Sequence, residues 1–163
     1  MSFPEPAPAN DFLAFHIERL RFSFRHWTGR ELIDADLDPT SAARGLYHAP
    51  FALVSHGTEP DPVFNYANLT AQCLFGMDWQ TFTQLPSRLS AEPPEQAQRR
   101  HLLEQVSRYG HISDYRGIRI AHNGRRFLIE GAVVWNVVDD RGNFYGQAAC
   151  FEHWHFLNDG YTP

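Results

Sequence analysis

The sequence from residue 111 to residue 156 reads HISDYRGIRIAHNGRRFLIEGAVVWNVVDDRGNFYGQAACFEHWHF, and its pattern decides the fold. Two groups of turn-forming residues, HNG at 122–124 and DDRGN at 139–143, divide it into three segments. Each segment alternates polar with apolar residues or is rich in β-branched ones, as strands are. Short turns join antiparallel neighbours, so the pattern predicts a meander of three long strands. The expected strands cover residues 111–121, 126–138 and 144–156.

Alternation along the first of these strands divides its side chains between two faces. One face is expected to carry Ile112, Asp114, Arg116, Ile118 and Ile120. Tyr115 and Arg119 then share the opposite face. The alternation does not say which face is concave, so either set could line an interior.

The region before the meander predicts two further strands and several helices. Short apolar runs at 51–55 and 62–66 flank the turn residues HGTEPD and indicate a hairpin. Helical texture follows from Asn68 to Phe75, and a longer helix is expected from Glu95 to Tyr109 before Gly110. The order of strands and helices predicts an α+β domain, a five-stranded antiparallel sheet with helices on one face.

An amphipathic helix is expected near the N-terminus. Residues 1–9 are proline-rich and are predicted to form a disordered lead, and residues 10–46 a helix and a linker. In the predicted helix over 11–27, one apolar stripe runs along one side, and Gly29 ends the helix. Phenylalanines also lie off that stripe, at positions 12, 15 and 22. This leaves two alternatives, a helix packed on its own domain or a homodimer contact through the helix.

Composition excludes several classes of protein. The 163 residues carry a net charge of −5, which argues against a nucleic-acid-binding surface. All fourteen cationic side chains are arginines, so lysine-dependent chemistry is excluded. No apolar run suggests a membrane span and no secretory signal is present, so we expect a cytoplasmic protein. Cys73 and Cys150 lack the spacing of a zinc site, and we expect no metal.

Several segments together resemble the MEKHLA family, which is related to PAS domains. These segments are FALVSHGTEPDPVFNYAN, LFGMDW, LPSRLSAE, RYGHISDYRGIRIAHNGRRF and VVWNVVDDRGNFYGQAACFEHW. The family occurs as stand-alone bacterial proteins, of which this chain looks like a member, and at the C-terminus of plant homeodomain-leucine zipper factors. The resemblance implies a PAS-like domain over residues 47–157, followed by a tail over 158–163. It implies a sensory role without an established reaction.

In such a fold a pocket lies between the sheet and the helices, so we expect a PAS-like module that binds a small molecule and signals through protein contacts to a partner not identified by the sequence. The residues predicted to line the pocket are Tyr66, Asn68, Trp79, Ser87, Arg88, Ser90, Tyr115, Arg119, Asn136 and Gln147.

Each of these residues also has a structural alternative. Asn68 is suited to cap a helix, and Tyr66 and Trp79 are suited to core packing. Arg88 suits an anionic ligand or an ion pair with Asp114 or Glu92. Asn136 and Gln147 must find hydrogen-bond partners, in the backbone or on a ligand.

The cofactor is left unknown by the sequence. Non-covalent flavin or haem remains open. Light-sensing LOV domains carry a cysteine-containing segment where this chain reads SRLSAE, so flavin–cysteine photochemistry is not expected.

No catalytic motif stands out, and we assign no catalytic residue. Two alternatives to the sensory hypothesis remain. One is an NTF2-like enzyme that uses Asp114 with Tyr115 or His111 for acid–base chemistry. The other is a protein-interaction module with a solid core and no ligand.

Overall fold

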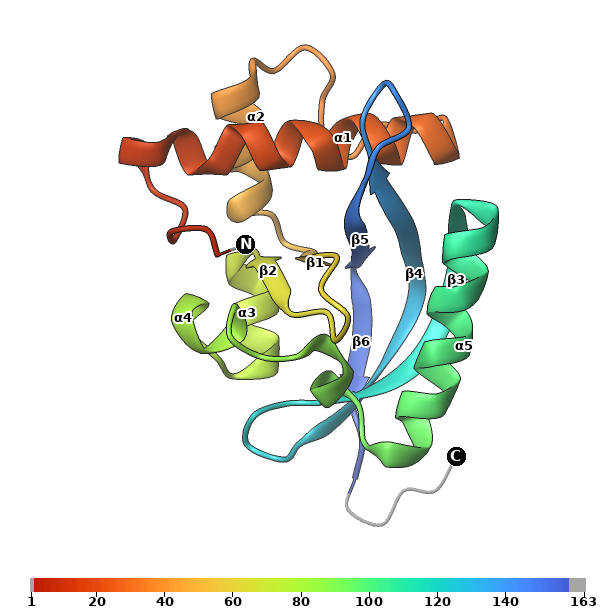
Figure 1. Cartoon of the computed structure of the whole chain (residues 1–163). Helices are drawn as coiled ribbons and strands as arrows, with labels where there is room; N and C mark the ends of the chain where they lie inside the picture. The colour runs from red at the N-terminus through yellow and green to blue at the C-terminus, as the bar shows by residue number, and fades with distance from the viewer. Residues whose placement is uncertain (1, 159–163) are drawn as a thin grey trace.

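The computed structural model describes residues 2–158. Its centre is an antiparallel sheet with strand order β2-β1-β5-β4-β3, in which the short β6 continues beyond β5 and also pairs with β4 (Figure 1). The strands are β1 (Ala52–His56), β2 (Phe64–Ala67), β3 (His111–Ile120), β4 (Arg126–Val138), β5 (Phe144–Phe151) and β6 (His153–Phe156). The predicted α+β class and the antiparallel meander are therefore confirmed.

Two β-bulges change which side chains share a face. From Ile112 to Tyr115 the chain advances three residues on β3 while the partner strand advances two, and Asp114 adopts a positive φ of 58°. Ile112 and Tyr115 consequently both pack into the same core, so the alternation predicted across this stretch is wrong. Gly131 on β4, with φ of 65°, provides a compensating extra residue before Gly117 pairs with Ile129.

Three helices and a 3-10 turn cover one face of the sheet. They are α3 (Leu69–Phe75), α4 (Trp79–Phe82), η2 (Ser87–Ser90) and α5 (Pro93–Tyr109). Side chains begin two of these helices: the Asn68 carboxamide accepts a hydrogen bond from Ala71 N, and the Asp78 carboxylate accepts one from Thr81 N. Helix α5 ends at Gly110, as predicted, and this glycine has a positive φ of 93°.

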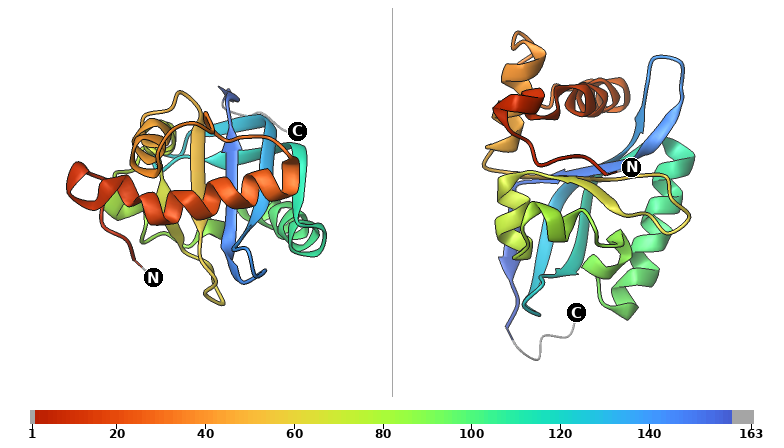
Figure 2. Two further views of the ribbon diagram at one scale, coloured as in Figure 1. Left: turned by 90° about the horizontal axis from the view of Figure 1, so that it is seen from above. Right: turned by 60° about the vertical axis from the view of Figure 1, so that its left-hand side comes forward.

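The N-terminal helices cover the opposite face, so the sheet lies between two helical layers (Figure 2). These helices are η1 (Pro8–Leu13), α1 (Ala14–Thr28) and α2 (Pro39–Tyr47). The predicted apolar stripe of α1 packs on its own sheet, because Ile17, Leu20 and Phe24 are buried beside Trp135 of β4. Phe15 and Phe22 point outward and remain exposed by 54% and 42%.

The start of α1 differs from the prediction. Asp11, Phe12 and Leu13 have φ values between 53° and 60°, so the regular helix begins at Ala14 rather than at residue 11. This left-handed turn directs the Phe12 ring onto Tyr47 of α2. That contact and the burial of Leu13 offset the cost of an unfavourable backbone conformation.

The predicted disordered lead is instead held against the domain over its described residues. Phe3 packs edge-on against Phe15 and contacts the His16 ring, and its carbonyl accepts a hydrogen bond from Trp79 Nε1. Of the predicted tail, residues 159–163 lie outside the described residues. Across the described chain, no helix has the length and apolar character that crossing a membrane requires.

Candidate functional site

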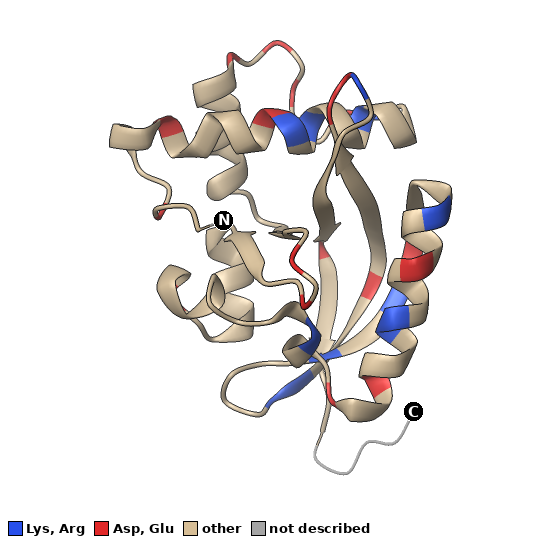
Figure 3. Cartoon of the chain, viewed as in Figure 1, with Lys and Arg blue, Asp and Glu red and all other residues tan. Residues whose placement is uncertain are grey.

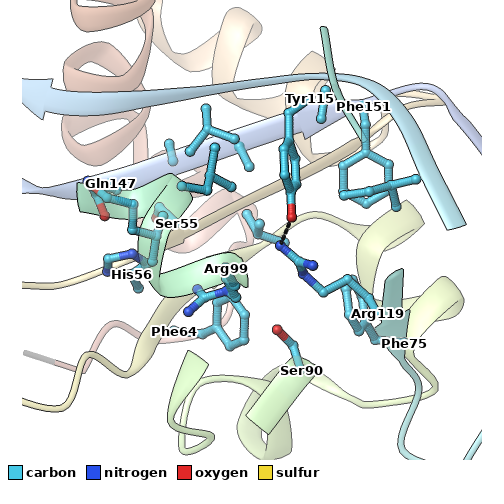
Figure 4. A pocket seen from close by; sticks show the side chains of 18 residues that line it. Ser55, His56, Phe64, Phe75, Ser90, Arg99, Tyr115, Arg119, Gln147 and Phe151 are labelled. Atoms are coloured by element: carbon cyan, nitrogen blue, oxygen red, sulfur yellow. Dashed lines mark hydrogen bonds between the residues drawn. The ribbon is translucent and has the colours of Figure 1, made fainter. Parts of the chain in front are cut away.

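A cavity lies between the sheet and α5 (Figure 4). The space open to the centres of water molecules is about 60 Å³, which corresponds to roughly four to six waters. Its apolar walls come from β1, β2, α3, α5, β4 and β5, and include Val54, Phe64, Phe75, Leu102, Ile129 and Phe151. Its polar lining is Ser55, His56, Ser90, Arg99, Tyr115, Arg119 and Gln147, with no aspartate or glutamate among the lining residues.

Strand β3 places Tyr115 and Arg119 in the cavity. The Tyr115 hydroxyl accepts a hydrogen bond from Arg119 Nη2 at 3.1 Å and donates one to Gln98 Oε1 at 2.8 Å. The tyrosine ring lies along the strand over Gly117, since a Cβ there would stand 2.2 Å from the hydroxyl oxygen. Gly117 therefore allows a large aromatic ring to lie flat against β3 and to meet Arg119.

Helix α5 contributes a second buried guanidinium. Arg99 is only 9% exposed, and it makes no hydrogen bond or ion pair within residues 2–158. Burial lowers the pKa of Arg99 to about 9, and the nearby Arg119 adds to this shift while Tyr115 opposes it. Arg99 and Arg119 thus bring two positive charges to one cavity whose wall supplies no negative charge.

His56 presents an unused acceptor at the same cavity. Its Nδ1 lies 3.0 Å from the Gly57 carbonyl and must carry the proton, because a carbonyl only accepts. Nε2 is then an unprotonated acceptor, and it is buried without a hydrogen bond. Burial lowers the pKa of His56 to about 4; the Gly57 carbonyl opposes this shift, Arg99 adds to it and Gln147 opposes it. The ring is neutral near pH 7.

The side-chain amides of Asn136 and Gln147 attach the C-terminal half of α5 to the sheet. Asn136 Oδ1 accepts a hydrogen bond from Gln147 Nε2 at 3.2 Å, and Asn136 Nδ2 donates to the Val106 carbonyl. Gln147 also donates to the Leu103 carbonyl and to Ser107 Oγ. Gln147 lines the cavity, whereas the hydrogen bonds of the Asn136 side chain connect α5 to the sheet.

A surface groove of about 480 Å³ adjoins the cavity, between the β1–β2 loop and α5. His56, Arg99 and Gln147 line both spaces, so the groove leads to the buried charges. Ser87 and Arg88 of η2 lie at the groove. Figure 3 marks basic positions on η2 and in the strands next to it, and both basic and acidic positions on α5.

Arg88 pairs with a residue that was not predicted. Its Nε lies 3.1 Å from one carboxylate oxygen of Asp61, and both side chains are about half exposed. Glu92 pairs instead with Arg126 at 3.6 Å, and Asp114 is exposed on its bulge. An exposed ion pair of this kind contributes less than about 1 kcal/mol.

Four predicted pocket residues lie outside the lining of the cavity and of the groove: Asn136, described above, and Tyr66, Asn68 and Trp79. Tyr66 and Trp79 belong to the apolar layer beneath α1 and α2. Asn68 is fully buried and accepts hydrogen bonds from Leu53 N and Ala71 N, while its Nδ2 donates to the carbonyls of Leu46 and Phe51. The structure thus brings together Ser90, Tyr115, Arg119 and Gln147 in the cavity, and Ser87 and Arg88 at its groove.

Sequence reasoning missed His56 and Arg99. Arg99 stands on the apolar stripe of its helix, three, four and seven residues before Leu102, Leu103 and Val106. A charged residue in such a stripe was the available signal. His56 occupies the same face of β1 as Ala52 and Val54, and the two-residue period would have found it.

Neither cysteine lies in the cavity. Cys73 is exposed on α3, and Cys150 is partly buried beside Phe51 and Glu152, outside the cavity lining. Burial raises the pKa of the Cys150 thiol to about 12. His153 and His155 are exposed on β6, and the described residues contain no group of three or more potential metal ligands.

Comparison with known proteins agrees with this architecture. The PAS domain of a protein from Colwellia psychrerythraea superposes with a TM-score of 0.60 at 12% identity, over 72% of this chain and 94% of that one. A fungal LOV photoreceptor domain superposes with a TM-score of 0.56 at 15% identity, over 86% of this chain and 91% of that one. At these identities the likeness establishes the fold alone.

Two curated plant proteins match in sequence. The homeobox-leucine zipper protein HOX10 of Oryza sativa is 25% identical over 137 residues, and HOX29 is 28% identical over 144 residues. Each match covers 83% of this chain, which spans only 16% of the relative. The MEKHLA domain model matches residues 14–156, which is most of the chain. On that match, the protein belongs to the MEKHLA domain family.

Proposed function

We propose that this protein is a PAS-like sensory module that binds a small molecule in the cavity between the sheet and α5. The observation that carries the proposal is the cavity itself, which adjoins a surface groove. It holds His56 Nε2, a buried acceptor without a hydrogen bond, and the largely buried Arg99 side chain, which makes no hydrogen bond or ion pair within residues 2–158. Buried polar groups ordinarily have hydrogen-bond partners. A ligand that enters by the groove would supply them.

The cavity favours a ligand much smaller than a flavin or a haem. Space for roughly four to six waters is several times smaller than a tricyclic flavin ring. A flavin would require Arg99 and Arg119 to leave the cavity. The MEKHLA chain therefore differs, in this proposal, from its structural neighbours that are described as light-oxygen-voltage receptors.

A signal could leave the cavity through α5 and α1. Asn136 N donates to the Gly110 carbonyl at the end of α5, while the Asn136 carbonyl accepts a hydrogen bond from Trp27 Nε1 of α1. The Trp27 ring also packs against Gly110, where a Cβ would lie 2.3 Å from it. A ligand that moves α5 would in this way alter the position of α1 and shift the equilibrium between two arrangements.

The outer face of α1 is the proposed contact surface. Phe15 and Phe22 are exposed there, although the opposite face of the helix is already buried on its own sheet. We propose a cytoplasmic homodimer joined through these rings. Phe15→Ser with Phe22→Ser is expected to give a monomer in sedimentation equilibrium, whereas exchange of the exposed Leu89 for Ser, away from α1, is expected to leave the dimer unchanged. A wild-type protein that stays monomeric would refute the dimer.

Native mass spectrometry of freshly purified protein tests the ligand proposal. We expect a retained small mass that disappears on denaturation. Ala132→Leu should fill the cavity and remove that mass, because Ala132 is a fully buried lining residue. A retained mass that survives in a folded Ala132→Leu variant would place the ligand elsewhere.

A further inference from the structure

Two guanidinium groups, those of Arg99 and Arg119, line one largely apolar cavity whose lining contains no carboxylate. Figure 4 shows the Arg99 and Arg119 side chains on either side of the same space, Arg119 at the Tyr115 hydroxyl and Arg99 beside His56, with Ser90 below them. Arg119 is 7% exposed and donates two hydrogen bonds, one to the Tyr115 hydroxyl and one to the Ile118 carbonyl. Arg99 donates no hydrogen bond within residues 2–158.

Such an arrangement is costly in a protein without its ligand. A buried charge is retained at low cost only when it is paired and hydrogen-bonded. Two like charges in one cavity also repel each other, and the lining supplies no acidic group. The missing partner is therefore anionic, and a planar guanidinium is suited to a carboxylate.

Size and polarity narrow the class of anion. Room for roughly four to six waters accommodates an acid of three or four carbons. Apolar walls such as Phe75, Ile129 and Phe151 suit a hydrocarbon body and disfavour inorganic phosphate, which is strongly hydrated on all sides. The unpaired Nε2 of His56 is an acceptor, so it matches a hydroxyl group on the ligand.

We infer that the cavity binds a small hydroxycarboxylate, with its carboxylate between Arg99 and Arg119 and its hydroxyl donating to His56 Nε2. The inference rests on the proposed function and names the ligand class of that same site. The groove that leads to this site is lined by three arginines and by two acidic residues, Asp61 and Glu104, so its lining has a net positive charge.

Calorimetric titration of the full chain with four probes tests the class. The probes are lactate, propionate, lactamide and inorganic phosphate, added after any retained molecule has been removed by dialysis. We expect lactate to bind most tightly and propionate more weakly. Lactamide, which lacks the negative charge, and phosphate, which lacks an apolar body, should not bind measurably.

Matched variants assign the contacts. Arg99→Gln should weaken lactate binding about ten- to a hundredfold, the range for a charged hydrogen-bonding partner. Arg108→Gln is the control, because that arginine is exposed on α5 and lines neither the cavity nor the groove. His56→Leu should remove the preference for lactate over propionate. Arg119→Gln provides a second test of the anion site should Arg99→Gln fail to fold.

Any of four results would overturn the inference. Lactamide could bind as well as lactate, phosphate could bind in place of the acids, lactate binding could be unchanged in Arg99→Gln, or neither acid could bind. The proposed function survives all of these if native mass spectrometry shows a neutral or cationic molecule that Ala132→Leu excludes. It fails separately if no small molecule of any kind depends on the cavity.

Discussion

At the scale of single residues, Arg99 is expected to lower the free energy of unfolding of the ligand-free protein. Its guanidinium is buried, unpaired within the described chain and repelled by Arg119. Arg99→Met should raise the free energy of unfolding of the ligand-free protein by about 1–3 kcal/mol, because an apolar side chain of similar length removes the buried charge. Urea unfolding measures this change. A loss of stability would show that Arg99 has a structural partner.

Arg100→Met is the matched control for that measurement. Arg100 is the next residue of α5 and is exposed. Its exchange should change the unfolding free energy by less than about 0.5 kcal/mol.

Asn68 illustrates the opposite kind of residue, one that stabilises without touching the cavity. Its carboxamide makes four hydrogen bonds that join α2, β1 and the start of α3. Asn68→Ala should lower the unfolding free energy by about 3–5 kcal/mol, since several buried groups lose their partners. The exposed cap Asp78→Ala should cost only about 1 kcal/mol. Ligand binding that disappears in folded Asn68→Ala, measured by native mass spectrometry, would contradict this assignment.

At the scale of elements, the cavity depends on irregularities in β3 and β4. The bulge at Asp114 turns Tyr115 inward, and Gly117 leaves room for its ring. Gly117→Ala should lower the unfolding free energy by about 1–3 kcal/mol, because the new methyl group displaces the ring. In a Tyr115→Ala background the same exchange should cost much less. Unfolding free energies of the four proteins form a double-mutant cycle, and additive effects would contradict the proposed contact.

These same irregularities mark the limit of prediction from sequence at this scale. The turns at 122–124 and 139–143 and the strands between them followed from local patterns, and the structure confirms them. A bulge shifts the two-residue alternation of side chains by one position. Gly131 is the only residue type in this stretch that indicates such an irregular backbone. Ile112 was therefore assigned to the wrong face. Arg99 was missed for a different reason: it is a single charged residue among the apolar residues on one side of α5, and a helical pattern alone does not give it a function.

At the scale of the whole molecule, the two helical layers could not be predicted from pattern alone. The apolar stripe of α1 predicted burial, but an apolar stripe does not specify its partner. The choice between its own sheet and another chain depends on long-range packing of residues such as Phe24 against Trp135. The positions of Tyr66 and Trp79 under that layer follow from the same packing.

The stability of the fold is expected to depend on acid pH through both faces of the sheet, because one neutral histidine is buried on each face. His16 is a buried residue of α1 with its Nε2 2.9 Å from Ser55 Oγ, and His56 lines the cavity. Burial lowers the pKa of each to about 4 from an ordinary value of 6.5; Arg19 adds to the shift of His16. Between these values the unfolded chain binds protons that the folded chain does not. Stability is therefore complete above about pH 6.5 and falls as the pH decreases towards 4.

Each histidine contributes about 3 kcal/mol to this loss, since one pKa unit corresponds to about 1.4 kcal/mol. Urea unfolding between about pH 7 and about pH 4 should show the combined decline, before carboxylates such as Asp139, whose pKa is about 2, begin to protonate. His16→Gln, which can keep a hydrogen bond to Ser55, should remove about half of it. His101→Gln, at an exposed position, should leave the slope unchanged. An equal slope in wild type and His16→Gln would mean that His16 is charged in the folded protein or that its burial is relieved by water.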